Sequence, residues 1–160
     1  MLETLLPGAQ RLQSAHPLFV HFPLAFLPAS ALLYVLAWLS GRDWWARMGL
    51  WFLVLGSASA AAAAATGLRA SEGVMIDSSV REQLLDPHRQ LMLATLGLSV
   101  ALAAWAVAAR PLPTRGRVVF LMLLAVLLML MSRGADYGGR MVYDYNAGGN
   151  ACPQPIEFTR

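Results

Sequence analysis

The chain has 160 residues, of which 58% are hydrophobic and 13% charged, a composition that excludes an ordinary soluble domain and is typical of a polytopic membrane protein. Its one cysteine, Cys152, excludes an internal disulfide and any multi-cysteine zinc or iron-sulfur site, and without a C-x-x-C-H motif a covalent c-type haem is excluded too. The net charge of +3 comes from arginine without lysine, and we attribute it to membrane topology rather than to nucleic-acid binding.

Four hydrophobic segments predict membrane spans within a single domain that covers residues 1–160. An α-helix rises about 1.5 Å per residue, so roughly 20 residues cross a hydrocarbon core of about 30 Å. The predicted spans are residues 17–39, 44–68, 88–109 and 118–134. The last one is short, so we expect its helix to continue past Arg133. The predicted fold class is all-α, a four-transmembrane-helix bundle in the lipid bilayer.

Prolines and capping patterns predict where the helices begin. Pro17 suits the first turn of the first span, and Asp86 is predicted as the N-cap of the third. The pattern over residues 79–82 is a capping box, which predicts a short surface helix before the third span. Pro23 and Pro28 each remove a backbone hydrogen bond inside the first span, so a kink is expected there.

Arginines predict the orientation. Five of the twelve lie in the two very short connections that follow the first and third spans: Arg42, Arg47, Arg110, Arg115 and Arg117. The positive-inside rule places these turns in the cytoplasm, and therefore both termini outside. We expect a multi-pass protein of the bacterial inner membrane with a short periplasmic C-terminal tail.

The three histidines all lie at the outer ends of predicted spans. His16 and His21 open the first span and His88 opens the third, and the chain has no others. Imidazoles there are costly unless a metal, a haem or a proton path uses them. Because His16 and His21 are five residues apart, a continuous helix separates them by about 140°.

The first and third spans run parallel and place His21 and His88 at similar depth, so we predict these two as the axial ligands of a haem b. His16 is then either a residue that supports the ligands without binding the iron itself or a substitute ligand. A copper or zinc site formed by all three histidines is an alternative, because imidazole suits both ions. A further alternative is that the histidines are ordinary interfacial residues.

Arginines near this end are candidate partners for haem propionates, namely Arg89, Arg133, Arg140 and Arg69. Snorkelling of these side chains to the membrane surface is the competing interpretation. Arg133 and Asp136 are three residues apart and are expected to pair on one helix face. Gly138 and Gly139 predict a turn at the membrane surface after the fourth span.

The same residues carry a family resemblance. The opening His-Pro-x-x-Val-His-Phe-Pro-Leu-Ala (residues 16–25), the segment 66–68, His88 and the Gly-Gly-x-x-Val-Tyr segment (residues 138–143) resemble the bacterial membrane family named domain of unknown function 2231. The resemblance covers nearly the whole chain. Members commonly continue with His-Gly-Val-Gly after the tyrosine, whereas residues 144–148 here read Asp-Tyr-Asn-Ala-Gly. Some members are fused to Rieske iron-sulfur or cytochrome-type domains, which implies a redox context.

These observations predict a non-catalytic electron-transfer subunit. It would bind haem b and relay electrons between a periplasmic cytochrome or iron-sulfur protein and quinone or another membrane carrier. The alternatives are a cofactor-free anchor or assembly subunit of a redox complex and a copper- or zinc-binding membrane protein. No hydrolase motif such as H-E-x-x-H or G-x-S-x-G is present, so no hydrolytic activity is expected.

Overall fold

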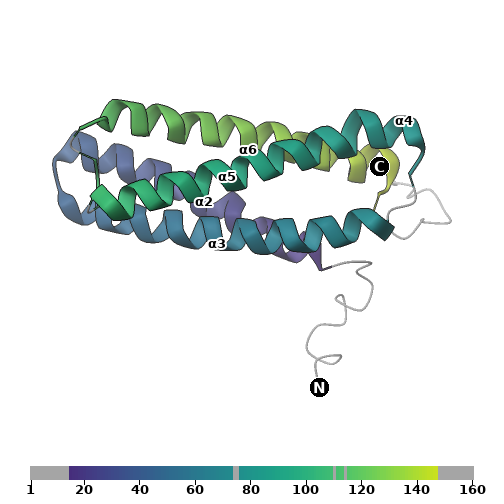
Figure 1. The fold of residues 1–160 in the computed structure, drawn as a ribbon, viewed down its shortest axis with the longest axis horizontal. Helices are drawn as coiled ribbons and strands as arrows, with labels where there is room; N and C mark the ends of the chain where they lie inside the picture. The colour runs from purple at the N-terminus through teal and green to yellow at the C-terminus, as the bar shows by residue number, and fades with distance from the viewer. Residues whose placement is uncertain (1–14, 74–75, 110, 114, 148–160) are drawn as a thin grey trace, which may run out of the picture.

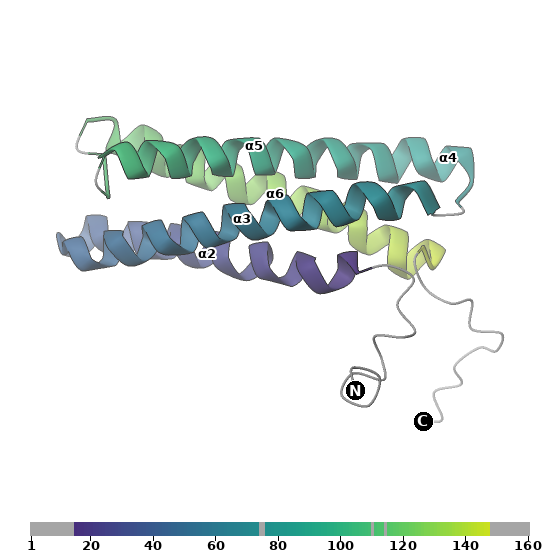
Figure 2. The ribbon, with the colours of Figure 1, turned by 60° about the horizontal axis from the view of Figure 1, so that its bottom comes forward.

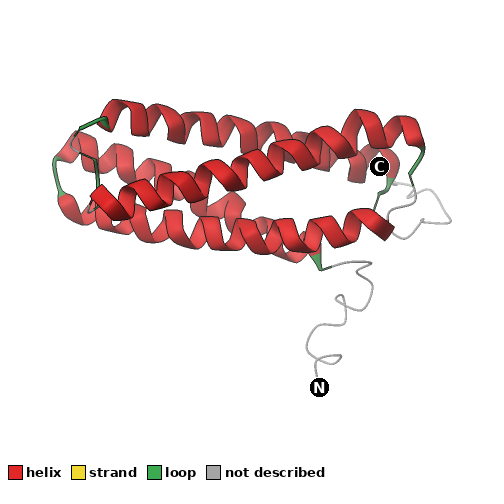
Figure 3. Ribbon diagram, viewed as in Figure 1, coloured by secondary structure: helices red, strands yellow, loops and turns green. Residues whose placement is uncertain are grey.

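The structure is a computed structural model that describes residues 15–73, 76–109, 111–113 and 115–147. Cys152, Arg110 and the predicted C-terminal tail beyond residue 147 lie outside the described residues. Within the described ranges the chain is helical, with short connections between the helices (Figure 3).

Four long helices form an antiparallel bundle (Figure 1). Each is long and apolar enough to cross a membrane, which confirms the predicted all-α, four-span fold class. They are α2 (His16–Ser40), α3 (Asp43–Gly73), α5 (Asp86–Ala109) and α6 (Arg117–Tyr145). We call the end where α2 begins and α6 ends the histidine end, and the opposite end, with the two tight connections, the turn end.

The helices form two hairpins that pack side by side. The most extensive contacts join α2 to α3 and α5 to α6, and smaller interfaces join α3 to α5 and α2 to α6. The order around the bundle is therefore α2, α3, α5, α6, and the parallel helices α2 and α5 lie diagonally across from each other (Figure 2). Both of them begin at the histidine end.

Small residues let α3 approach α2 closely. A Cβ atom on Gly56 would lie 2.6 Å from Cδ2 of Leu27, and one on Gly49 would lie 3.1 Å from Cδ2 of Tyr34. Since lipid is as apolar as leucine, such close packing replaces the hydrophobic effect in holding helices together. Leu27 and Tyr34 thus fill two of the hollows that the small residues of α3 create.

The main core lies in the middle of the bundle and at its turn end. All four helices contribute to it, for example through Leu27, Leu53, Leu102 and Leu124, none more than 1% exposed. A second, smaller cluster lies at the histidine end around Met141, which is 7% exposed.

Helix α2 begins at His16, one residue earlier than predicted, with Pro17 in its first turn as expected. It continues without interruption through Pro23 and Pro28 to Ser40. The early start matters for function because it makes His16 a residue of the helix itself.

Helix α5 begins differently from the prediction. The N-cap of the preceding helical segment is Asp77, whose side chain accepts a hydrogen bond from the Ser78 amide, and not a residue of the predicted capping box. Helix α4 (Ser78–Val80) continues into a π-helical turn, η2 (Arg81–Leu85), and then into α5. Asp86 is therefore not an N-cap: its amide donates to the Arg81 carbonyl, the spacing of a π-turn, immediately before the proline that cannot donate.

Helix α6 is longer than predicted and reaches Tyr145, so the expectation that it continues past Arg133 is confirmed. The predicted turn at Gly138 and Gly139 is wrong, because both residues lie inside the helix. The physical reason is packing: Met141, one turn further on, is buried in a cluster with two leucines of η2, Leu84 and Leu85. Helix α6 ends instead at Tyr145, and the next residue, Asn146, caps it in a left-handed conformation with φ 51°.

Candidate histidine site

His16 is anchored to the neighbouring helix of its own hairpin. Its Nδ1 atom lies 2.9 Å from the carbonyl oxygen of Ala63 and 3.3 Å from Oγ1 of Thr66, both on α3. The Thr66 hydroxyl is also within hydrogen-bonding distance of the Ala62 and Ala63 carbonyls. When its proton is donated to one of them, the oxygen lone pairs remain available to His16.

His88 is anchored in the same way in the other hairpin. Its Nδ1 atom lies 2.7 Å from the carbonyl oxygen of Gly134 on α6. Both histidines are half-buried, and each reaches from the first helix of a hairpin to the backbone of the second.

These hydrogen bonds select one tautomer for each ring. A backbone carbonyl can only accept, so Nδ1 of both His16 and His88 must carry the proton and donate it. In a neutral imidazole the lone pair then lies on Nε2. An Nδ1–H that is fixed by a carbonyl, with Nε2 left as the donor atom, is the arrangement by which proteins orient histidines that bind metal ions.

A glycine lies against each ring. A Cβ atom on Gly67 would be 2.8 Å from Cε1 of His16, and one on Gly138 would be 3.0 Å from Cε1 of His88. Ordinary carbon contacts are about 3.5–4.0 Å, so any larger residue at these positions would push against the imidazole. The glycines let each ring lie directly against the partner helix.

The two anchors are versions of one arrangement. The accepting carbonyl and the glycine are four residues apart in each case, Ala63 with Gly67 and Gly134 with Gly138. The histidine precedes its acceptor by 47 residues in the first hairpin and by 46 in the second. The sequence analysis named Gly138 and the segment that contains Gly67 but missed their contact with the histidines, although the small-x-x-x-small spacing of close helix pairs was present in both segments.

The two imidazoles also lie near each other. His16 lies at the start of α2 and His88 near the start of α5, so both lie at the histidine end of the bundle on the diagonal helices. The bundle therefore holds a pair of half-buried histidines, each with its Nδ1 atom engaged. Among the described residues no third His, Cys, Asp or Glu joins them as a ligand group for a metal ion.

His21 is not part of this pair. It lies on the exposed surface of α2, five residues beyond His16. The sequence analysis expected His21 opposite His88, but the arrangement found brings His16 to that position. The expected angular separation of about 140° explains why only one histidine of α2 can face the interior.

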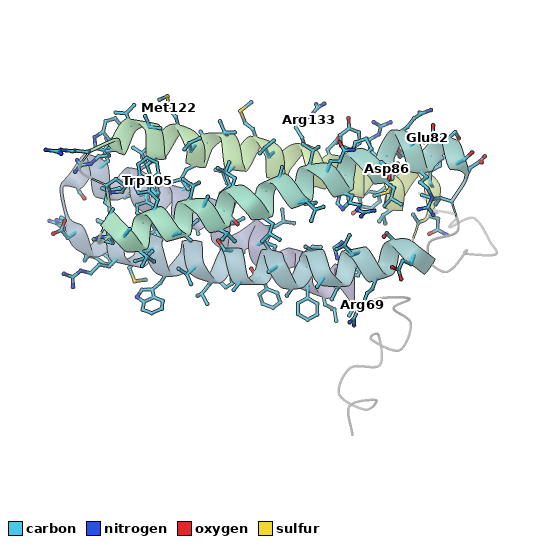
Figure 4. All side chains as sticks on the ribbon, viewed as in Figure 1. Arg69, Glu82, Asp86, Trp105, Met122 and Arg133 are labelled. Carbon is cyan, nitrogen blue, oxygen red and sulfur yellow. The ribbon has the colours of Figure 1, made fainter. Side chains whose placement is uncertain are left out.

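The predicted arginines occupy three different settings. Arg133 points outward from α6 (Figure 4), lines a groove on the surface and forms no ion pair with Asp136 in the described structure. Arg140 lies 3.7 Å from Asp144, an exposed pair of little energetic weight. Arg89 is exposed beside His88, and its role toward a propionate stays a prediction.

A comparison with known families agrees with these features. A family described as "Predicted membrane protein", domain of unknown function 2231, matches residues 13–151. The match spans most of the chain, and the protein belongs to this family, as the resemblance of its motifs predicted. No curated protein and no solved structure matches the chain.

Proposed function

We propose that this member of the family binds haem b between His16 and His88 and relays single electrons at one face of the membrane. The observation that carries the proposal is the matched pair of imidazoles, each with Nδ1 bonded to a carbonyl and Nε2 left as a donor. When bound, haem would supply one-electron exchange at its iron, which His16 and His88 would hold.

The residues around the pair have defined tasks in this proposal. The Ala63 and Gly134 carbonyls orient the rings and make Nε2 a stronger donor. Gly67 and Gly138 keep the partner helices free of side chains where the rings lie. Ligands from diagonal, parallel helices also match the way in which helix bundles build cofactor sites from facing helices.

The proposal revises the ligand set expected from the sequence. His16 replaces His21 as the partner of His88, because His16 is half-buried and anchored whereas His21 is exposed. Copper or zinc remains the alternative occupant, since two imidazole nitrogens suit either ion. A cofactor-free membrane anchor is the other alternative, and one experiment separates all three.

The experiment uses the full chain, expressed with added haem precursor and purified in detergent. We expect a Soret band and, after dithionite reduction, the sharp bands of a six-coordinate, low-spin haem. His16→Ala and His88→Ala should each abolish this spectrum or convert it to a five-coordinate one. His21→Ala is the matched control, because it removes an imidazole from the same helix but from its exposed surface, and it should keep the spectrum.

Three outcomes would overturn the proposal. A protein without a Soret band and without metal would favour the anchor function. Stoichiometric copper or zinc, lost in the His16 and His88 variants, would assign the pair to a metal ion. A haem spectrum that is lost in His21→Ala but kept in His16→Ala would restore the pairing expected from the sequence.

A further inference from the structure

A groove lies on the surface of the α5–α6 hairpin near the histidine end. It has a volume of about 410 Å³, within the usual range of about 300–1,000 Å³ for ligand sites. Its lining residues are Pro87, Gln90, Leu91 and Ala94 of α5 and Arg133 and Tyr137 of α6. Gln90, Ala94 and Arg133 are exposed, so the groove opens outward from the bundle, toward the lipid.

The groove combines an apolar lining with hydrogen-bond donors on both walls. Gln90 lines the α5 wall, and Arg133 and Tyr137 line the α6 wall. Each of these three side chains carries a hydrogen-bond donor. No carboxylate lines the groove, and Arg133 has no ion-pair partner among the described residues. A ligand for this groove is therefore flat or apolar in its body and carries hydrogen-bond acceptors at its edges.

The depth of the groove corresponds to the edge of the hydrocarbon core. Arg133 lies sixteen residues after Arg117, which at about 1.5 Å per residue is about 24 Å along α6, and Tyr137 is about 30 Å along it. The hydrocarbon core is about 30 Å thick. At this depth the long side chain of Arg133 can place its guanidinium at the interface, within reach of the headgroup of a ligand that lies in the bilayer.

The groove shares its walls with the anchor of His88. Pro87 precedes His88, Arg133 precedes the Gly134 whose carbonyl accepts from that histidine, and Tyr137 precedes Gly138. A ligand in the groove would thus be separated from the imidazole only by the α5–α6 contact.

We infer that this groove binds the headgroup of a membrane quinone. A quinone ring is flat and carries two carbonyl acceptors on opposite sides, so one can meet Gln90 and the other Arg133 or Tyr137. A phospholipid gathers its acceptors in one phosphate and would engage mainly the Arg133 wall. Electron exchange between this quinone and a haem rests on the proposed function, but binding of the quinone does not depend on haem.

The test measures binding directly. Full-length protein in phosphatidylcholine nanodiscs is labelled with a photoreactive azido analogue of decylubiquinone, with unlabelled decylubiquinone as competitor, and the labelled peptides are mapped by mass spectrometry. We expect saturable labelling within residues 87–94 and 133–137. Arg133→Leu should weaken binding roughly tenfold or more, as expected for a lost hydrogen bond to a charged group, and Gln90→Leu should weaken it roughly threefold to tenfold, as expected for a neutral one. Arg89→Leu removes a neighbouring arginine that does not line the groove and should leave binding unchanged.

Several outcomes would overturn the inference. Labelling that is not saturable, or that is equal in Arg133→Leu, Gln90→Leu and the Arg89→Leu control, would show that the groove does not recognise quinone. Competition by phosphatidylglycerol as effective as that by decylubiquinone would assign the groove to an anionic lipid.

The haem proposal is tested separately by recording the absorption spectrum of the wild-type protein used for labelling. Saturable labelling of a wild-type protein without a Soret band would leave the quinone site standing and refute the haem proposal. A haem spectrum without saturable labelling would support the haem proposal and refute the quinone site.

Discussion

Replacing Gly67 by alanine tests whether the histidine pair is held by its backbone anchors. The added Cβ atom would lie 2.8 Å from Cε1 of His16. With about 3.5 Å as the closest comfortable carbon separation, the ring must retreat by about 0.7 Å. That retreat would lengthen the 2.9 Å contact between Nδ1 and the Ala63 carbonyl to at most about 3.6 Å, which weakens or breaks the hydrogen bond.

The energetic consequence can be bounded. Overpacking of this kind costs about 1–3 kcal/mol, while replacing glycine by alanine inside a helix returns up to about 1 kcal/mol of helix propensity. Loss of the group that orients a ligating histidine lowers cofactor affinity about 10–100-fold. Gly97→Ala is the matched control, because nothing lies within 4 Å of a Cβ atom there, so it should be neutral or slightly stabilising.

The assay exploits the fact that the chain has only three histidines. Nitrogen-15 NMR of histidine-labelled protein in nanodiscs, without cofactor, should show two rings with the proton on Nδ1, those of His16 and His88. Gly67→Ala should return one of them to the mixture of tautomers typical of a free imidazole, and Gly97→Ala should not. If the two variants give the same spectrum, or if the wild-type rings carry their protons on Nε2, the anchor reasoning is wrong.

Three other perturbations follow from the structure. Ala63→Leu should destabilise the bundle by about 1–3 kcal/mol, because this alanine is 8% exposed against α2, whereas the exposed Ala61→Leu should be tolerated in thermal unfolding. Met141→Ala should cost about 2 kcal/mol and raise hydrogen exchange in the last turns of α6, while the exposed Val142→Ala should change neither; equal protection in both would show that the small cluster does not hold the helix end. Reporter fusions in the α2–α3 and α5–α6 connections should behave as cytoplasmic, and a periplasmic signal from either would reverse the orientation expected from the arginines.

The spans could be predicted from the sequence because hydrophobic length alone decides them in a bilayer. The helix ends could not, because they depend on contacts between distant segments. Gly138 and Gly139 have the composition of a turn, yet α6 continues through them because Met141 packs on η2. The start of α5 could not be predicted from the sequence either, because a π-turn joins the preceding helical segment to α5 at Asp86.

The sequence placed all three histidines at one end of the bundle but did not show that His16, rather than His21, contacts the neighbouring helix. Comparing depths along the helices favoured His21, because His21 and His88 both lie near the start of an apolar run. In the structure the His16 side chain faces α3 whereas the His21 side chain is exposed, and these directions depend on where α2 contacts α3. The anchoring groups are backbone carbonyls, which every residue possesses, so no residue type reveals them. The glycines that flank them were the only available signal.

The repeated anchor means that each hairpin carries half of the candidate site. A hairpin of α2 and α3 alone presents one oriented imidazole, and α5 with α6 presents the other. The interfaces between the hairpins are smaller than those within them. A ligand held by both rings would therefore link the two hairpins where the bundle has its less extensive contacts. Such a ligand would stabilise the assembled bundle by a free energy that grows with the logarithm of its concentration over its dissociation constant. Maturation of the protein would then be a docking event, in which two hairpins already inserted in the membrane are locked together by what they jointly hold.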